Sequence, residues 1–297
     1  MNIIYIMGTG RSATTIMEIL LTNNFGITGV GEVTHIFRDG FIRNDLCSCG
    51  FKAKTCFIWG NVFDRLNLSG SEVTKYSDLF HKFDWHIGFL GLIFGFFNKN
   101  NKSDYKSVNY DIFKNVSNLT NCNFIVDSSK YASRAILLSK LFPGKVKVIC
   151  LSRSPSGLIK AFKKTDTLEQ KPKKLYDIVL YYTFVMLCCR IAVNTIGKQN
   201  CTVITFEQLM KQPYEVLSII ERLTGTNLKE AKQKILKNES FKIGHIVTGN
   251  RLRKKGSIQF KPSSSRYIPE GWVESISEKA MLFFGKALGF HYKKEND

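Results

Sequence analysis

The first fifteen residues constrain the fold more than any other stretch of this sequence. Ile3 to Met7 form a continuous apolar run of strand type, and Gly8-Thr9-Gly10-Arg11-Ser12 follows as a turn. Apolar residues then recur at helical spacing, at Ile16, Ile19 and Leu20. A buried strand that passes through a glycine turn into a helix is typical of an α/β fold. The helix N-terminus in such a turn is a site for a phosphate.

The residue types in this turn suit an anion. Glycines let the backbone approach a ligand closely, and Arg11 adds a fixed positive charge with several donors. The hydroxyls of Thr14 and Thr15 can donate to phosphate oxygens. The alternative is a plain tight turn between a strand and a helix. The residues that we expect to bind the phosphate are Gly8, Thr9, Gly10, Arg11, Ser12, Ala13, Thr14 and Thr15.

Two common nucleotide motifs do not fit this turn. A nucleoside triphosphatase loop needs a second glycine and a lysine where this chain has Ala13 and Thr14. The dinucleotide pattern needs a third glycine, which is again Ala13, although alanine is sometimes tolerated there. We also find no acidic residue that ends a second strand near residue 30 in the right context. ATP hydrolysis of the usual kind and dinucleotide binding are therefore disfavoured.

The rest of the chain alternates strand-like and helical segments. Such alternation predicts a mainly parallel sheet covered by helices on both faces. The stretch from about residue 40 to 120 reads as irregular, and Asn98 to Ser107 as a surface loop. No linker divides the chain, so we expect one domain over residues 1–297, with a variable acceptor-side insertion at about 33–120. The expected strands are 3–7, 123–127, 146–151 and 202–206, and the expected helices begin near residues 14, 128, 155, 172, 213 and 228.

The chain carries a formal net charge of +19, which suits an anionic partner such as a phosphorylated cofactor, an acidic glycan or a membrane surface. A solvated lysine-rich surface explains the charge equally well. The basic residues are dispersed and the aromatic residues look like core, so we expect no nucleic-acid partner. Ile178 to Ile196 is long enough to span a membrane but carries Arg190 and Asn194, so we expect a buried helix and no transmembrane segment. The start lacks signal-peptide features, which favours a cytoplasmic location.

Several motifs resemble those of the sulfotransferases that use 3′-phosphoadenosine 5′-phosphosulfate (PAPS). Gly10-Arg11-Ser12-Ala13-Thr14-Thr15 resembles their 5′-phosphosulfate loop, Arg/Lys-Ser-Gly-Thr-Thr. Leu151–Pro155 is similar to their 3′-phosphate motif, and Thr205–Leu209 to their Tyr-Glu-Asp-Leu segment. His245–Arg253 resembles a late Gly-Asn plus Arg motif of bacterial members. The match runs in the expected order over nearly the whole chain. It implies a P-loop-like three-layer fold, PAPS as co-substrate, 3′-phosphoadenosine 5′-phosphate as product, and no metal.

The resemblance also implies roles for individual residues. Glu32 lies 21 residues after Arg11, the separation at which tyrosylprotein sulfotransferases place their catalytic Gly-Glu. It would be the general base, and Lys130 would contact the oxygen that bridges sulfur and phosphorus, while Arg11 stabilises the charge on the leaving phosphate. Glu32 and Lys130 also fit solvated surface residues. His35 is the rival base, although a helical surface histidine is the simpler interpretation.

The resemblance implies that Arg153, Arg251 and Arg253 bind the 3′-phosphate. The family's second ligand for this phosphate, a serine eight residues after the arginine, is Ala161 here, and Phe206 replaces a tyrosine. Ser154 or Ser156 is a candidate substitute, and Phe206 would keep the packing without the hydroxyl contact. These departures keep two alternatives open. One is a diverged nucleotide-binding protein without transfer activity, and the other is a P-loop-type nucleotide kinase or ATPase.

Cys47, Cys49 and Cys56 form a group that resembles a Cys-x-Cys-Gly and Cys-x-x-Trp segment of some bacterial sulfotransferases. Three close thiols suggest zinc, but no fourth ligand lies at finger spacing. We therefore favour a packed loop at the acceptor entrance and expect no metal. The acceptor class stays broad, namely a glycan, a lipid or another small molecule. The sequence leaves peripheral membrane contact and the oligomeric state open.

Overall fold

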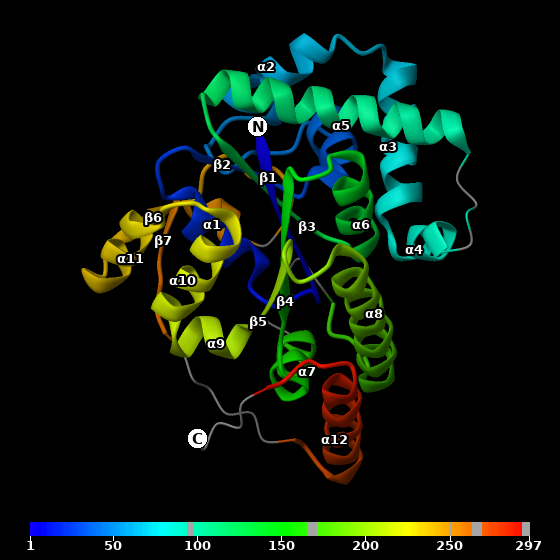
Figure 1. Cartoon of the computed structure of the whole chain (residues 1–297), viewed down its shortest axis with the longest axis vertical. Coiled ribbons are helices and arrows are strands. Elements are labelled where there is room, and N and C mark those ends of the chain that lie inside the picture. Colours follow the sequence, from blue (N-terminus) through cyan, green and yellow to red (C-terminus); the bar gives the residue numbers. More distant parts are fainter. Residues whose placement is uncertain (94, 96–97, 165–170, 250, 263–268, 293–297) are drawn as a thin grey trace.

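The computed structural model describes all residues except 94, 96–97, 165–170, 250, 263–268 and 293–297, and its centre is a parallel sheet (Figure 1). The five strands lie in the order β2-β3-β1-β4-β5, and every neighbouring pair is parallel. This architecture confirms the α/β fold with a mainly parallel, P-loop-like sheet between helices. The strands are β1 (Asn2–Gly8), β2 (Ile27–Gly31), β3 (Phe124–Lys130), β4 (Val146–Ser152) and β5 (Cys201–Thr205).

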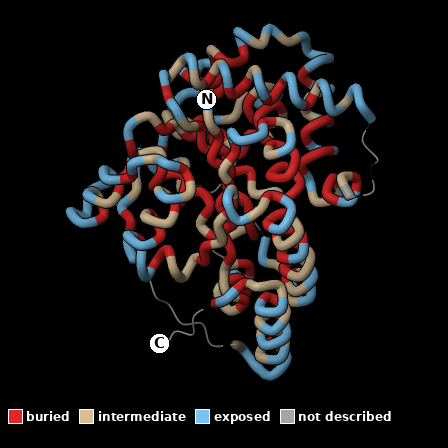
Figure 2. Tube along the Cα trace, viewed as in Figure 1, coloured by how far each residue is buried: buried red, intermediate tan, exposed pale blue. Residues whose placement is uncertain are grey.

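The central strand β1 shows why the sheet is buried on both sides. Tyr5 and Met7 belong to one hydrophobic cluster, while Ile4 and Ile6 belong to the other. Side chains of a strand alternate between its faces, so an uninterrupted apolar run must be covered twice. Figure 2 shows the buried sheet strands inside a layer of half-buried and exposed helices.

Helices cover the two faces. One face carries α1 (Thr14–Thr22), α10 (Pro213–Thr224) and α11 (Lys229–Leu236), and the other carries α6 (Ala132–Leu141) and α8 (Leu175–Ile196) (Figure 1). These positions match the helices expected from the sequence within a few residues. The remaining helices and strands of the C-terminal half are α7 (Pro155–Lys163), α9 (Phe206–Lys211), β6 (Ser240–Lys242), η4 (Arg251–Lys255), β7 (Ser257–Gln259) and α12 (Trp272–Ala287).

Strand β2 was not expected, because two of its five residues are glycines. A Cβ on Gly29 would lie 2.6 Å from Oε1 of Glu18, and one on Gly31 would lie 2.9 Å from Cγ2 of Ile246. Tertiary contacts therefore demand glycine where strand propensity disfavours it. Glu32 follows β2 directly, so an acidic residue does end this strand, but the strand does not lie where a dinucleotide fold needs it. Dinucleotide folds have strand 2 beside strand 1, whereas here β3 separates β2 from β1.

The insertion after β2 is more regular than the sequence indicated. It contains η1 (Val33–His35), the π-helix η2 (Ile36–Ile42), η3 (Ala53–Thr55), α2 (Phe57–Leu66), α3 (Gly70–Asp84), α4 (His86–Ile93) and α5 (Lys99–Thr120). The expected surface loop at Asn98–Ser107 was wrong, because it is the start of α5. Asn98 caps this helix by accepting from the amide of Asn101 at 2.8 Å. Tyr105, Val108 and Ile112 then give α5 a buried stripe at helical spacing.

Helix α8 is long and apolar enough to cross a membrane by length and composition. In this structure it packs against the sheet and against α6, α7 and α12. The Tyr181 hydroxyl accepts a hydrogen bond from the amide of Gly10 at 2.7 Å, so this helix supports the N-terminal loop. The helix therefore packs against the core in this structure, and the absence of a transmembrane segment stays a prediction. The single-domain boundaries and the cytoplasmic location stay predictions.

Candidate functional site

A cavity of about 410 Å³ opens at the carboxyl ends of β1, β2 and β3. Parallel α/β sheets bind ligands at this edge. The wall contains four cationic side chains and one carboxylate, so the site suits an anion. The charged residues are Arg11, Arg38, Lys130, Lys173 and Glu32, and the others are Gly10, Ala13, Thr14, Thr15, Ile16, His35, Phe162, Tyr181, Thr248, Gly249 and Leu252.

Three wall residues have a strained backbone. Arg11, Ala13 and Lys130 have φ values of 66°, 70° and 76°, in the left-handed region that favours glycine. Among the described residues, the other non-glycine residues with positive φ are asparagines, which tolerate this conformation. Strain of this kind persists where the surrounding structure holds it, often at functional sites. The left-handed φ of Ala13 also explains why the sulfotransferase loop that this turn resembles has glycine at this position.

The N-terminal loop presents donors to the cavity. Helix α1 begins at Thr14 without a side-chain cap, so its first-turn amides remain available to a ligand or to water. Thr9 Oγ1 is buried and has no hydrogen-bond partner among the described residues, although Thr9 does not itself line the cavity. Gly8 holds the loop against β4, because a Cβ there would lie 1.8 Å from the carbonyl oxygen of Leu151. These features fit a bound phosphate group.

Glu32 and Lys130 form an ion pair in the cavity wall. Lys130 Nζ contacts Oε1 of Glu32, and the two side chains are 25% and 9% exposed. The register between β1 and β3 shifts just before Lys130, which pairs with Met7. A strand irregularity of this kind re-aims a side chain near an active site. The structure thus places these two predicted residues together, rather than as separate surface charges.

Glu18 is a buried carboxyl group that sequence analysis missed. Its Oε1 accepts from the amide of Gly31 at 2.7 Å, and its Oε2 accepts from the Ser128 hydroxyl at 2.6 Å. These partners precede Glu32 and Lys130, so Glu18 ties together the ends of the two strands that carry the ion pair. Burial raises the pKa of Glu18 to about 8. The sequence did contain a signal for this group, because Glu18 is an acidic residue on the apolar side of a predicted helix.

His35 also lines the cavity, contrary to the surface position favoured by the sequence. Its Nε2 lies 4.0 Å from Oε2 of Glu32, and its side chain is 13% exposed. Burial lowers the pKa of His35 below its usual value, so the imidazole is neutral at pH 7. It is therefore a chemically competent rival to Glu32 as a base.

Arg153 lies beside the loop rather than in the cavity wall. Its Nη1 donates to the carbonyl oxygen of Arg11 at 2.8 Å, and its guanidinium carbon lies 4.1 Å from the centre of the Phe206 ring. Phe206 therefore provides the packing expected of it. Ser154 donates to Glu207 at 2.7 Å and caps α7 through the amide of Gly157, so its hydroxyl is already engaged.

Of the expected 3′-phosphate ligands Arg251 and Arg253, only the second has a described side chain. Arg253 Nη1 donates to the carbonyl oxygen of Leu46 at 2.7 Å, and Leu252 lines the cavity. Arg251 begins η4, but its side chain lies outside the description, as does residue 250 of the Gly-Asn motif.

The cavity residues without a sequence signal are Arg38, Lys173 and Tyr181, since each reaches the wall through a fold contact rather than a motif.

Comparisons with known structures place the fold among sulfotransferases. The sulfotransferase domain from the curacin biosynthetic pathway aligns with a TM-score of 0.53 and 16% identity, over 98% of this chain and 99% of that one. The sulfotransferase domain from the olefin synthase of Synechococcus PCC 7002 aligns with a TM-score of 0.51 and 16% identity, over 98% and 95% of the two chains. No family model and no curated protein matches this sequence.

Proposed function

We propose that this chain is a sulfotransferase that moves the sulfuryl group of PAPS to a hydroxyl or amine of a carbohydrate, lipid or other small acceptor. The observation that carries the proposal is one cavity that joins the Arg11 loop to the Glu32–Lys130 pair. A loop that grips phosphate beside an acid–cation pair provides the positioning and charge stabilisation that such in-line transfer needs. The fold is one that sulfotransferase domains use.

On the donor side, Arg11 and the uncapped start of α1 would hold the 5′-phosphate. Lys130 would contact the oxygen between sulfur and phosphorus and stabilise the charge that develops as that bond breaks. Arg153 would pair with the 3′-phosphate through its guanidinium group. In this proposal Arg251 and Arg253 close over the same phosphate.

On the acceptor side, Glu32 would act as the general base. The acceptor oxygen or nitrogen forms a bond to sulfur while the bond from sulfur to the bridging oxygen breaks. The electron pair of that bond remains on the 5′-phosphate of the product, and the acceptor's proton passes to the Glu32 carboxylate. General-base help of this kind is worth about 10²–10⁴-fold in rate.

Calorimetric titration of the full chain with 3′-phosphoadenosine 5′-phosphate tests this proposal. We expect saturable binding without magnesium, and a loss of affinity of about 30-fold or more in Arg11→Ala. Arg222→Ala, which removes an exposed arginine on α10, is the matched control and should bind normally. A labelled-sulfate screen over glycans, lipids and phenols then identifies the acceptor.

Three results would contradict parts of the proposal. Heat from ATP with magnesium but none from the bisphosphate would indicate a kinase or ATPase. Unchanged affinity in Arg11→Ala would remove the loop from the site. Tight bisphosphate binding with no transfer to any acceptor would indicate a diverged nucleotide-binding protein.

A further inference from the structure

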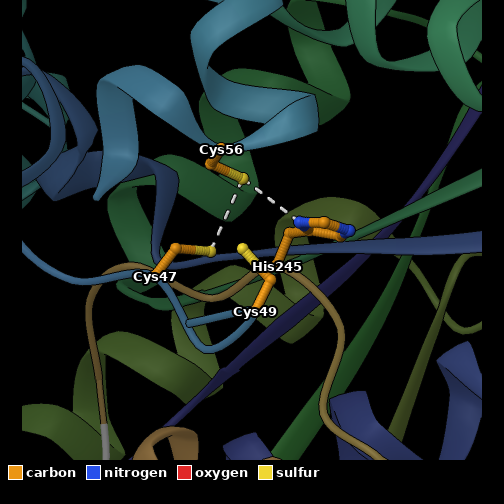
Figure 3. A group of neighbouring side chains, drawn as sticks. All are labelled: Cys47, Cys49, Cys56 and His245. Atoms are coloured by element: carbon orange, nitrogen blue, oxygen red, sulfur yellow. Dashed lines mark hydrogen bonds between the residues drawn. The ribbon is translucent and has the colours of Figure 1, made fainter. Parts of the chain in front are cut away.

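Four potential metal ligands meet on the side of the sheet that carries the insertion, apart from the cavity (Figure 3). Cys47 and Cys49 come from the loop after η2, and Cys56 precedes α2. His245 comes from the segment after β6, 189 residues beyond Cys56. The three sulfur atoms and one imidazole nitrogen all lie within 4.8 Å of one another. We propose that these side chains form a Cys₃His zinc site.

The distances fit one tetrahedral ion. Cys56 Sγ lies 3.7 Å from Cys47 Sγ and 3.1 Å from Nδ1 of His245. Zinc–sulfur bonds of about 2.3 Å at tetrahedral angles separate two sulfur ligands by about 3.8 Å. Figure 3 shows the four side chains pointing toward a common centre. The cluster therefore needs only small side-chain adjustments to bind zinc.

The ligand chemistry favours structural zinc over other uses of the thiols. Thiolate and imidazole ligands are soft or borderline, which excludes calcium and magnesium as the preferred ions. A disulfide between Cys47 and Cys56 would need a sulfur separation of about 2.05 Å and would leave Cys49 and His245 without a role. Four protein ligands leave no open position, so the ion would be structural rather than catalytic.

The backbone around the cluster is already organised. The amide of Cys47 donates to Phe51 O at 2.8 Å, and the amide of Gly50 donates to Cys47 O at 3.0 Å, which shapes the tight Cys-x-Cys turn. Ser48 joins this turn to the histidine segment, because its hydroxyl donates to Gly244 O and accepts from the amide of Ile246. Such preorganisation lowers the cost of binding an ion.

The histidine segment connects the cluster to the cavity. Trp59 Nε1 donates to the carbonyl oxygen of His245 at 2.9 Å, which fixes the segment from the α2 side. Ile246 then packs against Gly31, and Gly249 lies so close to Glu32 that a Cβ would be 2.9 Å from Oε1. A zinc ion here would hold together the insertion and the strip of chain that lines the wall beside the ion pair.

The proposal departs from the expectation of no metal, which was based on the missing fourth ligand. A histidine at finger spacing is absent from the sequence, but the fold brings one from a distant segment. The proposal does not depend on sulfuryl transfer, and its test uses metal content and stability rather than activity.

The experiment measures zinc in the full chain, purified without chelator and without a metal-affinity tag. We expect about one zinc per chain and, after exchange, the visible bands of tetrahedral cobalt with thiolate ligands. His245→Ala and Cys49→Ser should lose most of the metal, while His245→Cys, which restores a fourth ligand, should retain it. Cys122→Ser alters a buried cysteine outside the cluster and should keep full zinc content. A strong chelator should lower the melting temperature by about 5 °C or more.

Three outcomes would overturn the proposal. The first is metal-free protein that takes up no added zinc or cobalt. The second is a Cys47–Cys56 disulfide in protein purified under reducing conditions. The third is full zinc content in both His245→Ala and Cys49→Ser. If either variant fails to fold, the cobalt spectrum of the native chain and the His245→Cys variant still decide between these results.

Discussion

The end of strand β3 carries two ion clusters that differ in their access to solvent. Lys130 pairs with Glu32 in the cavity wall, where the two side chains are 25% and 9% exposed. Three residues earlier, Asp127 pairs with Arg134, and both side chains are 0% exposed. The first pair can exchange its partner for a ligand, whereas the second is sealed. Access, rather than charge, separates a group available for chemistry from one that holds the fold.

The sealed cluster is fully hydrogen-bonded. Arg134 donates to Asp127 at 2.8 Å, to Asp84 at 3.0 Å and to the side-chain oxygen of Asn109 at 2.7 Å, while Tyr105 donates to Asp84. These residues belong to β3, α3, α5 and α6. The network therefore fastens α3 and α5 of the insertion to β3 and α6.

The largest expected effect is on turnover, and it comes from the open pair, Glu32 and Lys130 in the cavity wall. Glu32→Gln removes a proton acceptor and keeps the shape of the side chain, so turnover should fall by about 10²–10⁴-fold. Binding of 3′-phosphoadenosine 5′-phosphate and the urea midpoint should stay near native values. Steady-state kinetics, calorimetry and denaturation measure the three quantities, with the exposed Glu215→Gln as control. Near-normal turnover, combined with a large loss in His35→Asn, would transfer the base role to His35.

A substitution in the sealed cluster should lower the free energy of unfolding. Arg134→Met leaves two buried carboxylates without their partner, which should cost about 3–5 kcal/mol of unfolding free energy. The exposed Arg65→Met is the control, and urea denaturation with both variants measures the difference. A loss below about 1 kcal/mol would mean that the network is dispensable, and the contrast with the open pair would fail.

Glu18 contacts Ser128, which lies between Asp127 and Lys130 in the chain, and it predicts a pH-dependent effect on stability. Its folded-state pKa of about 8 lies above the value of 4.5 for an unperturbed glutamate. The stabilisation is therefore complete below pH 4.5 and declines as the pH rises through 8. Glu18→Gln cannot ionise. Its amide oxygen can accept from the amide of Gly31 and its amide nitrogen can donate to the Ser128 hydroxyl, so the variant should lose most of this pH-dependent decline in stability. Parallel native and variant slopes between pH 5 and pH 8 would contradict this role.

Much of the fold could be predicted from the sequence because its signals are local. The apolar runs of β1 and β4, the glycine turn and the helix starts at Pro155 and Pro213 depend on residues next to one another. The β2 strand and the start of α5 could not be predicted in this way. The glycines of β2 are required by contacts with side chains that are distant in the sequence. The first residues of α5 are mostly polar, so they do not reveal the buried stripe of the helix.

The residues of the candidate site also fall into two groups, namely those that local sequence predicts and those that only the fold brings together. The sequence by itself determined the N-terminal loop, because backbone geometry, a helix start and an arginine within one turn suffice for an anion site. It also indicated Glu32 and Lys130 as separate candidates. Only the tertiary structure decided that they touch, that Glu18 supports both, and that His245 meets the three thiols. Those relations join strands or loops that are far apart in the chain, and their distances exist only after the sheet has formed.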